Sequence, residues 1–477
     1  MAKTGNRSAK RSANAIDAPY TAEEIAAEER KPKRKVAVMV GYAGTGYLGM
    51  QLNPGTKTIE GDLFAAFVAA GAISKANADD PKKSSFLRCA RTDKGVHAAG
   101  NVISLKLIVE DEDIVDRIND NLPDQIRVWG MQRTNNGFSC YTACDSRWYE
   151  YLLPSYTLLP PHPDSFLGKE MLKAAKETGT HDEMSQRLDD VKDFWDDVEE
   201  GTIRPMLAKL DPELREEVMT LLRTSDGFKE MGYRNFDDIE NRAVTPPPEA
   251  PVPPNDPPGT QSEPSDAQDA PEQSPAVTGA PGRVAHDAAP ATPAEAAFRD
   301  IRKAYVAAKR RYRITPPRLQ KLQAALDQYK GTNNFHNYTV QKGFGDPSAQ
   351  RVIKSFIVNP QPVQIRDTEW LSLKVHGQSF MMHQIRKMVA MVAMVVRCGA
   401  PLDIIPRSYG KKHIAIPKAP SLGLLLERPV FDSYNRRAVE NLGREPIDFG
   451  NYEDRINEFK DREIYSRMWD TEENHDV

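Results

Sequence analysis

The residues best suited to chemistry form one short segment in which a carboxylate, Asp93, lies between two cations, Arg91 and Lys94. Neighbouring positive charges favour the ionised form of a carboxylic acid. We therefore expect a lowered pKa for Asp93, which suits a nucleophile better than a proton donor. Gly95 predicts a turn after it, and residues 102–107 then alternate as a strand does. A surface turn with a local ion pair is the alternative interpretation.

Two further segments carry side chains that could bind a substrate. Tyr149 points to one face of a predicted strand over residues 146–153, and Trp148 points to the other face. Aromatic rings on a sheet can stack on bases, although core packing is their commoner role. His383 and Arg386 lie three residues apart near the start of a predicted helix and so share a face. Their burial would be costly without an anionic partner; a capped, half-exposed helix start is the alternative.

Two other motifs are weaker. Residues 44–49 match the G-x-G-x-x-G dinucleotide fingerprint after a strand, but that fingerprint needs a helix to begin there. Residues 53–55, Asn-Pro-Gly, break the chain instead. Cys140 and Cys144 are spaced like half of a zinc site, yet no second Cys/His pair follows at a suitable distance. We expect neither a cofactor nor a metal ion.

The elements that must position these residues follow an α+β pattern. Strand and helix patterns run β-α-β-α-β-β over residues 36–158, which we take as an N-terminal catalytic half. The α+β character returns over residues 294–440, a C-terminal half that includes a long apolar helix over 381–397. Two such halves facing each other would leave a cleft between them.

The composition changes outside these halves. Residues 159–243 are polar and helix-forming, and they predict a helical insertion. Residues 244–293 are rich in Pro, Ala and acidic residues without apolar periodicity, so they predict a disordered linker. Residues 1–35 predict a disordered basic leader, and residues 441–477 an acidic tail.

Length, charge and composition limit the classes of protein to which the chain can belong. The 477 residues are too many for one compact core, and the net charge of -4 conceals basic and acidic segments that cancel. Four scattered cysteines indicate a reducing compartment rather than a disulfide scaffold. No apolar run is long enough to cross a membrane. The basic cluster at residues 30–35 suits a nuclear import signal or RNA contacts, and a solvated linker is the alternative.

The order and spacing of these motifs resemble the TruA family of tRNA pseudouridine synthases, in its eukaryotic pseudouridine synthase 1 branch. The family's catalytic R-T-D-x-G-V-H-A is present unchanged at residues 91–98. Its opening Y-x-G-T-x-Y-x-G-x-Q is present as well, with Met50 in place of the usual Trp. The other matches are R-x-Y-x-Y at 147–151, G-T-x-N-F-H-N-[FY] at 331–338, F-[ML]-x-H-Q-[IV]-R-x-M at 380–388 and A-P-x-x-G-L-x-L at 419–426.

The resemblance implies two α+β halves with a mixed, mainly antiparallel sheet around a central basic cleft, plus a disordered insertion and tails. It implies that uridine becomes pseudouridine without a redox cofactor: the N1–C1′ bond breaks, uracil turns, and C5 bonds to C1′. Asp93 is the implied catalytic carboxylate. Arg91 would hold the flipped position and pair with Asp93. Tyr149 would stack on the base, and Arg386 would place positive charge beneath the carboxylate. Leu424 would close an apolar wall against water.

The implied substrate is tRNA, with small nuclear or messenger RNA as further candidates. We expect RNA contacts from the basic helix at residues 299–313 and from Lys82 and Lys83. The branch is implied to be nuclear and to use the nuclear import machinery, with an additional mitochondrial pool as an alternative, and the insertion favours a monomer. Three competing functions stay open: a non-catalytic RNA-binding relative, the family branch that modifies the 3′ side of the anticodon arm, and a glycosidase, which would need a second acid near Asp93.

Overall fold

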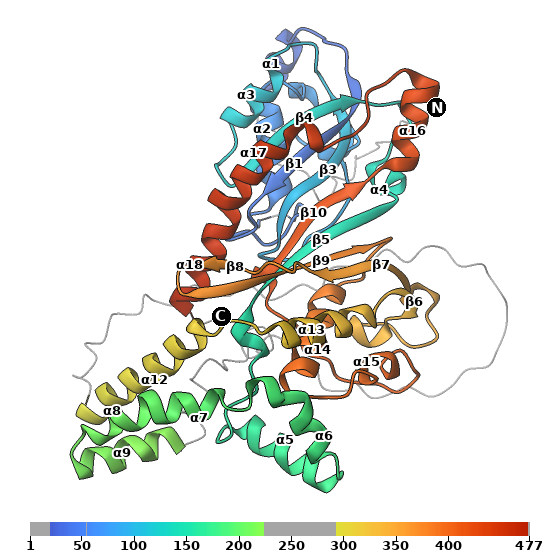
Figure 1. The fold of residues 1–477 in the computed structure, drawn as a ribbon. Helices are drawn as coiled ribbons and strands as arrows, with labels where there is room; N and C mark the ends of the chain where they lie inside the picture. The colour runs from blue at the N-terminus through green and yellow to red at the C-terminus, as the bar shows by residue number, and fades with distance from the viewer. Residues whose placement is uncertain (1–19, 54, 224–291, 476–477) are drawn as a thin grey trace, which may run out of the picture.

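The computed structural model describes residues 20–53, 55–223 and 292–475 (Figure 1). Most of the predicted basic leader and of the predicted linker at 244–293 lies outside these residues. The strands are β1 Arg34–Tyr42, β2 Leu87–Arg88, β3 His97–Leu107, β4 Ile126–Arg133, β5 Ser146–Pro154, β6 Gly331–Asn334, β7 Gln350–Val358, β8 Val363–Ile365, β9 Thr368–Gly377 and β10 Leu424–Val430. They form one sheet with the order β4-β1-β3-β10-β5-β9-β7-β6, and β2 and β8 pair with β3 and β9.

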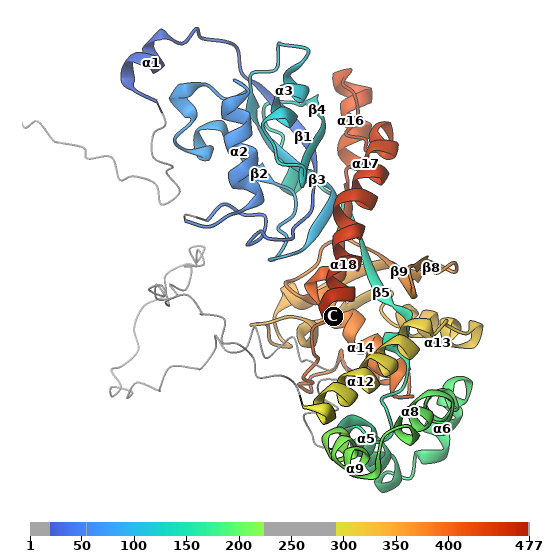
Figure 2. The same ribbon diagram turned by 90° about the vertical axis from the view of Figure 1, so that its left-hand side faces the viewer.

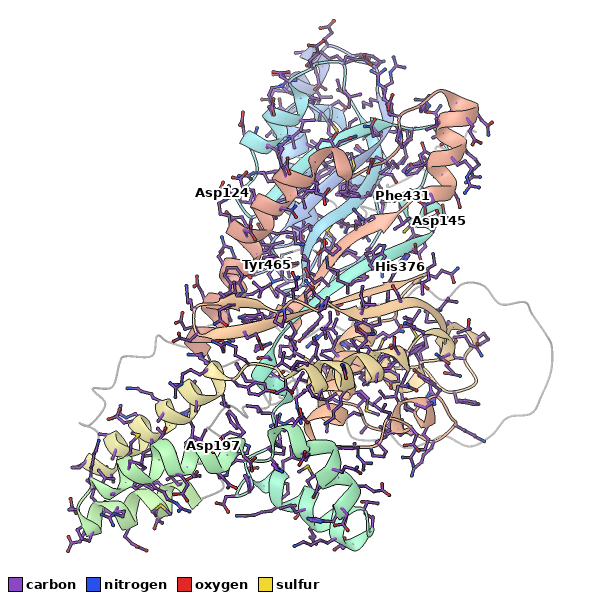
Figure 3. All side chains as sticks on the ribbon, in the orientation of Figure 1. Asp124, Asp145, Asp197, His376, Phe431 and Tyr465 are labelled. Atoms are coloured by element: carbon purple, nitrogen blue, oxygen red, sulfur yellow. The ribbon has the colours of Figure 1, made fainter. Side chains whose placement is uncertain are left out.

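The late strand β10 joins the two halves. It lies between β3, to which it is parallel, and β5, to which it is antiparallel, while the other neighbours along the sheet are antiparallel. The main-chain N–H of Asp145 donates to the carbonyl of Val430 at 2.9 Å where the two strands meet, and Figure 3 shows Asp145 near Phe431 there. The predicted α+β fold with a mixed, mainly antiparallel sheet is confirmed.

Helices cover both faces of the sheet, and Figure 2 shows α2 on one side and α16 and α17 on the other. The side chains on one face of the sheet, Val38 and Val40 among them, pack in one core with α2, α13 and α14. Met39, on the opposite face of β1, packs in a second core with Phe459 of α17. The larger helices of these two layers are α2 Ile59–Ala69, α3 Ile114–Asp120, α13 Pro316–Asp327, α14 Gln384–Arg397, α16 Asp432–Leu442, α17 Glu453–Phe459 and α18 Ser466–His475.

The C-terminal tail differs from the disordered tail that we expected. Residues 453–475 are helical, because Phe459, Ile464 and Met468 bury their side chains against the sheet. Lys460 also forms ion pairs with the buried Glu150 of β5 and with Glu427 of β10. An acidic composition therefore concealed an apolar stripe with helical spacing.

The polar insertion forms a helical lobe. Its helices are α5 Phe166–Glu177, α6 His181–Leu188, α7 Phe194–Val198, α8 Arg204–Ala208 and α9 Pro212–Arg223, and α12 Pro293–Arg311 packs against α9. The fully buried guanidinium of Arg318 on α13 bonds Asp190 at 3.0 Å and so ties the lobe to the second half. The short helices α1 Ala22–Ala27, α4 Cys140–Ala143 and α15 Ile404–Arg407 complete the described fold. Within the described ranges, no helix has the length and apolar character needed to cross a membrane.

Candidate active site

A cleft of about 1110 Å³ lies where the two halves meet. Its walls come from the loop before β3, from β5, from the start of α14 and from the start of β10. The structure brings together all five residues singled out in the sequence, and each of them lines the cleft: Arg91, Asp93, Tyr149, Arg386 and Leu424. Among the described lining residues there are five arginines and one carboxylate, so the cleft is basic.

Hydrogen bonds hold the loop that carries Asp93. Thr92 is buried, and its hydroxyl lies 2.9 Å from the phenol oxygen of Tyr42 on β1. The amide of Asn101 on β3 donates to the same phenol and to the carbonyl of Ala90. The two central strands therefore fix the main chain on both sides of Arg91.

The glycine-rich segment after β1 packs directly on this loop. A Cβ on Gly44 would lie 2.2 Å from the carbonyl oxygen of Val96, and one on Gly49, whose φ is +101°, would lie 2.9 Å from the carbonyl oxygen of Thr92. The N–H of Met50 donates to that Thr92 carbonyl at 3.1 Å. The next helix, α2, begins only at Ile59, so the segment supports the Asp93 loop and lacks the helix start that a dinucleotide site needs.

Asp93 faces the second half of the chain. Partial burial alone would raise its pKa, but His383, Arg386 and Lys418 outweigh this effect, so the pKa of Asp93 is lowered. The predicted direction of the pKa shift is confirmed, whereas the predicted cause, the charges of Arg91 and Lys94, is not. The charges that lower the pKa come from the second half of the chain, from His383, Arg386 and Lys418, and no ion pair joins Asp93 to Arg91 in the described part of the chain.

His383, which the sequence placed beside Arg386 without a role of its own, contacts Asp93. Its Nδ1 lies 3.3 Å from Oδ2 of Asp93, and its side chain is 18% exposed. That nitrogen has no aligned hydrogen-bond partner among the described residues, yet its closeness to the carboxylate is the main influence that lowers the pKa of Asp93. The anionic partner that a buried His–Arg pair requires is thus Asp93 itself.

The backbone explains how His383 reaches the carboxylate. We predicted a helix from residue 381, but α14 begins at Gln384, and His383 precedes it with φ +61°, in the left-handed region. His383 and Arg386 consequently do not share a helix face. A left-handed conformation is uncommon for a residue other than glycine and is often found at functional sites. The positive end of the helix dipole also lies at this start of α14, beside the carboxylate.

Arg386 is buried beneath the cleft and held in place. Its Nε donates to the carbonyl of Ala419 at 2.6 Å, and the N–H of Ala419 donates back to the Arg386 carbonyl at 3.1 Å. Arg91, by contrast, is exposed on the wall of the cleft. The two arginines therefore differ in setting: one is a fixed charge and the other is accessible from solvent.

An apolar wall faces Asp93. Tyr149 is 8% exposed and packs edge-to-face on Phe380, with ring centroids 5.2 Å apart. Leu424 begins β10 and is 7% exposed. Burial raises the pKa of the Tyr149 phenol, so its hydroxyl keeps its proton at neutral pH. Trp148 points to the other face, as the alternation predicted, and there it stacks on His376.

Arg147 is a positioning residue that the sequence did not single out. Its guanidinium donates to the carbonyl of Cys89 in the first half at 2.9 Å and to that of Gln378 in the second half at 3.2 Å. Cys140 and Cys144, which we weighed as half of a zinc site, direct their thiols to main-chain carbonyls. In the ranges that the structure covers, no three His, Cys, Asp or Glu side chains gather as metal ligands.

Comparison with known proteins points to one family. A family model described as tRNA pseudouridine synthase matches residues 325–432. A Yarrowia lipolytica protein named tRNA pseudouridine synthase 1 is 44% identical over 462 residues, which are 97% of this chain and 75% of that protein. The Schizosaccharomyces pombe protein of the same name is also 44% identical, over 94% of this chain and 82% of its own length. The Saccharomyces cerevisiae tRNA pseudouridine(27/28) synthase is 34% identical over 84% and 85%.

Proposed function

Because this chain belongs to the tRNA pseudouridine synthase family, we propose that Asp93 is the carboxylate with which it isomerises uridine. The chain is an isomerase that converts uridine to pseudouridine in tRNA. One observation carries the assignment of Asp93. It is the carboxylate that lines the basic cleft in the described part of the chain, and its pKa is lowered.

The reaction needs no exchange of atoms with a co-substrate. The N1–C1′ bond breaks, uracil turns within the cleft, and C5 bonds to C1′; C5 then loses a proton while N1 gains one. An ionised Asp93 can attack C1′ or assist loss of the base by taking a proton. A lowered pKa keeps the carboxylate in the form that both routes need.

The neighbouring residues fit roles around that carboxylate. Arg386, fixed by Ala419, supplies positive charge beneath Asp93. Tyr149 offers a ring face to the turned base, and Leu424 excludes water that would otherwise hydrolyse the intermediate. Arg91 is exposed at the cleft wall, where it can occupy the position that the flipped uridine leaves in the RNA.

The test uses the purified full-length chain and unmodified tRNA transcripts. We expect pseudouridine in the nucleoside digest and no free uracil by mass spectrometry. Free uracil in amounts matching uridine loss would indicate a glycosidase, and RNA binding without pseudouridine would indicate a non-catalytic relative. Sequencing of the modified positions distinguishes the synthase 1 pattern from modification at the 3′ side of the anticodon arm.

We also propose a nuclear location, a monomer and action on some other RNAs. The basic cluster at residues 30–35 supports import, although Lys31 and Arg34 form ion pairs with Asp111 and Glu110. Fusion to a fluorescent protein, with residues 30–35 replaced by Ala, tests this: a nuclear signal that persists would exclude the cluster as the import signal. Sedimentation of the free chain tests the monomer, and mapping of pseudouridine in small nuclear and messenger RNA tests the wider substrate range.

A further inference from the structure

The arginines around the cleft differ in what they bind. Arg88 pairs with the buried carboxylate of Glu60. Arg147 donates to two main-chain carbonyls, and Arg386 donates to one. These three guanidinium groups serve the protein's own structure. Arg91 and Arg351 remain, and neither has a carboxylate within ion-pair distance among the described residues.

Arg351 is the less exposed of these two. It lies on β7 opposite Asn333, and among the described residues its Nη1 donates only to the adjacent carbonyl of Gln350, at 3.1 Å. Its Nε is buried and has no hydrogen-bond partner among the described residues. Burial lowers the pKa of Arg351, and the charge of Asp346 partly offsets this effect; a guanidinium stays charged at neutral pH. A partly desolvated cation with unused donors is suited to a phosphate, which matches the planar fork of arginine.

The same cleft also carries an exposed aromatic ring. Tyr141 belongs to the short helix α4, lines the same cleft as Arg351 and is 66% exposed. Most of its ring surface therefore contributes nothing to a core. The two residues come from different halves of the chain, and both line this cleft.

We propose that Tyr141 and Arg351 form a subsite for the nucleotide next to the flipped uridine, with its base stacked on Tyr141 and its phosphate bound by Arg351. This inference rests on the proposed function, because it assumes an RNA substrate in the cleft. Flipping a uridine removes one stacking partner from the neighbouring base and separates the backbone phosphates there. An aromatic ring can replace the lost stacking partner, and a guanidinium beside it can bind the displaced phosphate.

The first experiment measures the dissociation constant of the full-length chain for an unmodified tRNA transcript. Loss of one base–aromatic stack weakens binding by about tenfold, so we expect that change for Tyr141→Ala. Tyr141→Phe, which keeps the ring, should bind as the wild type does. Phe166→Ala removes an aromatic ring that is 79% exposed on the insertion lobe, and it serves as the matched control with unchanged affinity.

The second experiment separates the phosphate from the base. One lost phosphate contact to a single strand reduces the slope of log Kd against log salt by about 0.7. We expect that reduction for Arg351→Ala but not for Tyr141→Ala. A transcript with 2-aminopurine beside the converted uridine reports the stack directly. Its fluorescence should be quenched on binding to the wild type and to Tyr141→Phe, and should stay bright with Tyr141→Ala.

The outcomes distinguish the subsite from the function. Unchanged affinity and quenching in Tyr141→Ala, or an unchanged salt slope in Arg351→Ala, would overturn the subsite even if pseudouridine still forms. A wild-type chain that binds tRNA but makes no pseudouridine would refute the proposed function, and the affinities and salt slopes, which do not require conversion, would still decide whether Tyr141 and Arg351 bind RNA. Thermal midpoints within a degree or two of wild type exclude misfolding as the cause.

Discussion

The contact between His383 and Asp93 gives a prediction that separates electrostatics from backbone strain. Asn and Gly both tolerate the left-handed conformation that His383 adopts at φ +61°. His383→Gly removes the ring, whereas His383→Asn keeps a short polar side chain that can donate toward the carboxylate. Because both variants accept this backbone conformation, a difference between them reports on the interaction with Asp93.

The geometry sets the expected magnitude. Unit charges at the 3.3 Å separation of Nδ1 and Oδ2 would attract by about 5 kcal/mol at an effective dielectric constant of ~20. The carboxylate is 40% exposed, so solvent screening reduces this to about 1.4 kcal/mol for a charged imidazole, which corresponds to about one pKa unit of Asp93. We therefore expect the acid limb of the pH–activity profile to move up by about one pH unit in His383→Gly and by less in His383→Asn.

Single-turnover assays with tRNA over a range of pH test the reasoning. The lowered pKa of Asp93 keeps the carboxylate ionised to lower pH than usual, and activity is lost as the pH falls through that pKa. Removal of His383 should move this acid limb to higher pH, with little change in KM. An acid limb at the same pH in the wild type and in both variants would refute an electrostatic role for His383.

Three further changes test the loop, the buried histidine and the apolar wall. Gly44→Ala should abolish most activity and destabilise the fold by more than about 2 kcal/mol, because its Cβ would lie 2.2 Å from the Val96 oxygen. Gly137→Ala, where the space is open, is the control. Equal melting curves for the two variants would contradict the packing argument. Burial lowers the pKa of His97 to about 4. Below about pH 6.5 the unfolded chain therefore binds a proton at this histidine and the folded chain does not. The unfolding free energy should fall by up to about 3 kcal/mol as the pH approaches 4. His97→Gln should flatten that fall and the half-exposed His181→Gln should not; denaturant titrations at several pH values decide this. Leu424→Ala should lower activity and release detectable uracil because water enters the cleft, and an unchanged, uracil-free product would exclude a water-excluding role.

Local sequence patterns predicted the parts of the site that depend on local structure. The loop around Asp93, its entry into β3 and the opposite faces of Trp148 and Tyr149 follow from turn chemistry and strand alternation. The α+β class followed in the same way from the alternation of strand and helix patterns.

The remaining features depend on contacts between distant segments. Nothing local indicates that β10 lies between β3 and β5, because strand pairing is decided by partners far away in the chain. The left-handed His383 has a similar origin, since tertiary contacts hold it against its own backbone preference. The interpretation of the acid between two cations as a local ion pair failed for the same reason, because the partner of Asp93 lies in the second half.

The most direct test of the central claim replaces the Asp93 carboxylate by an amide of the same shape. Asp93→Asn should form no detectable pseudouridine in a single-turnover reaction with saturating tRNA, while it binds that tRNA with wild-type affinity and melts at the wild-type temperature. Pseudouridine at more than a few per cent of the wild-type rate would contradict the assignment of Asp93 as the catalytic carboxylate.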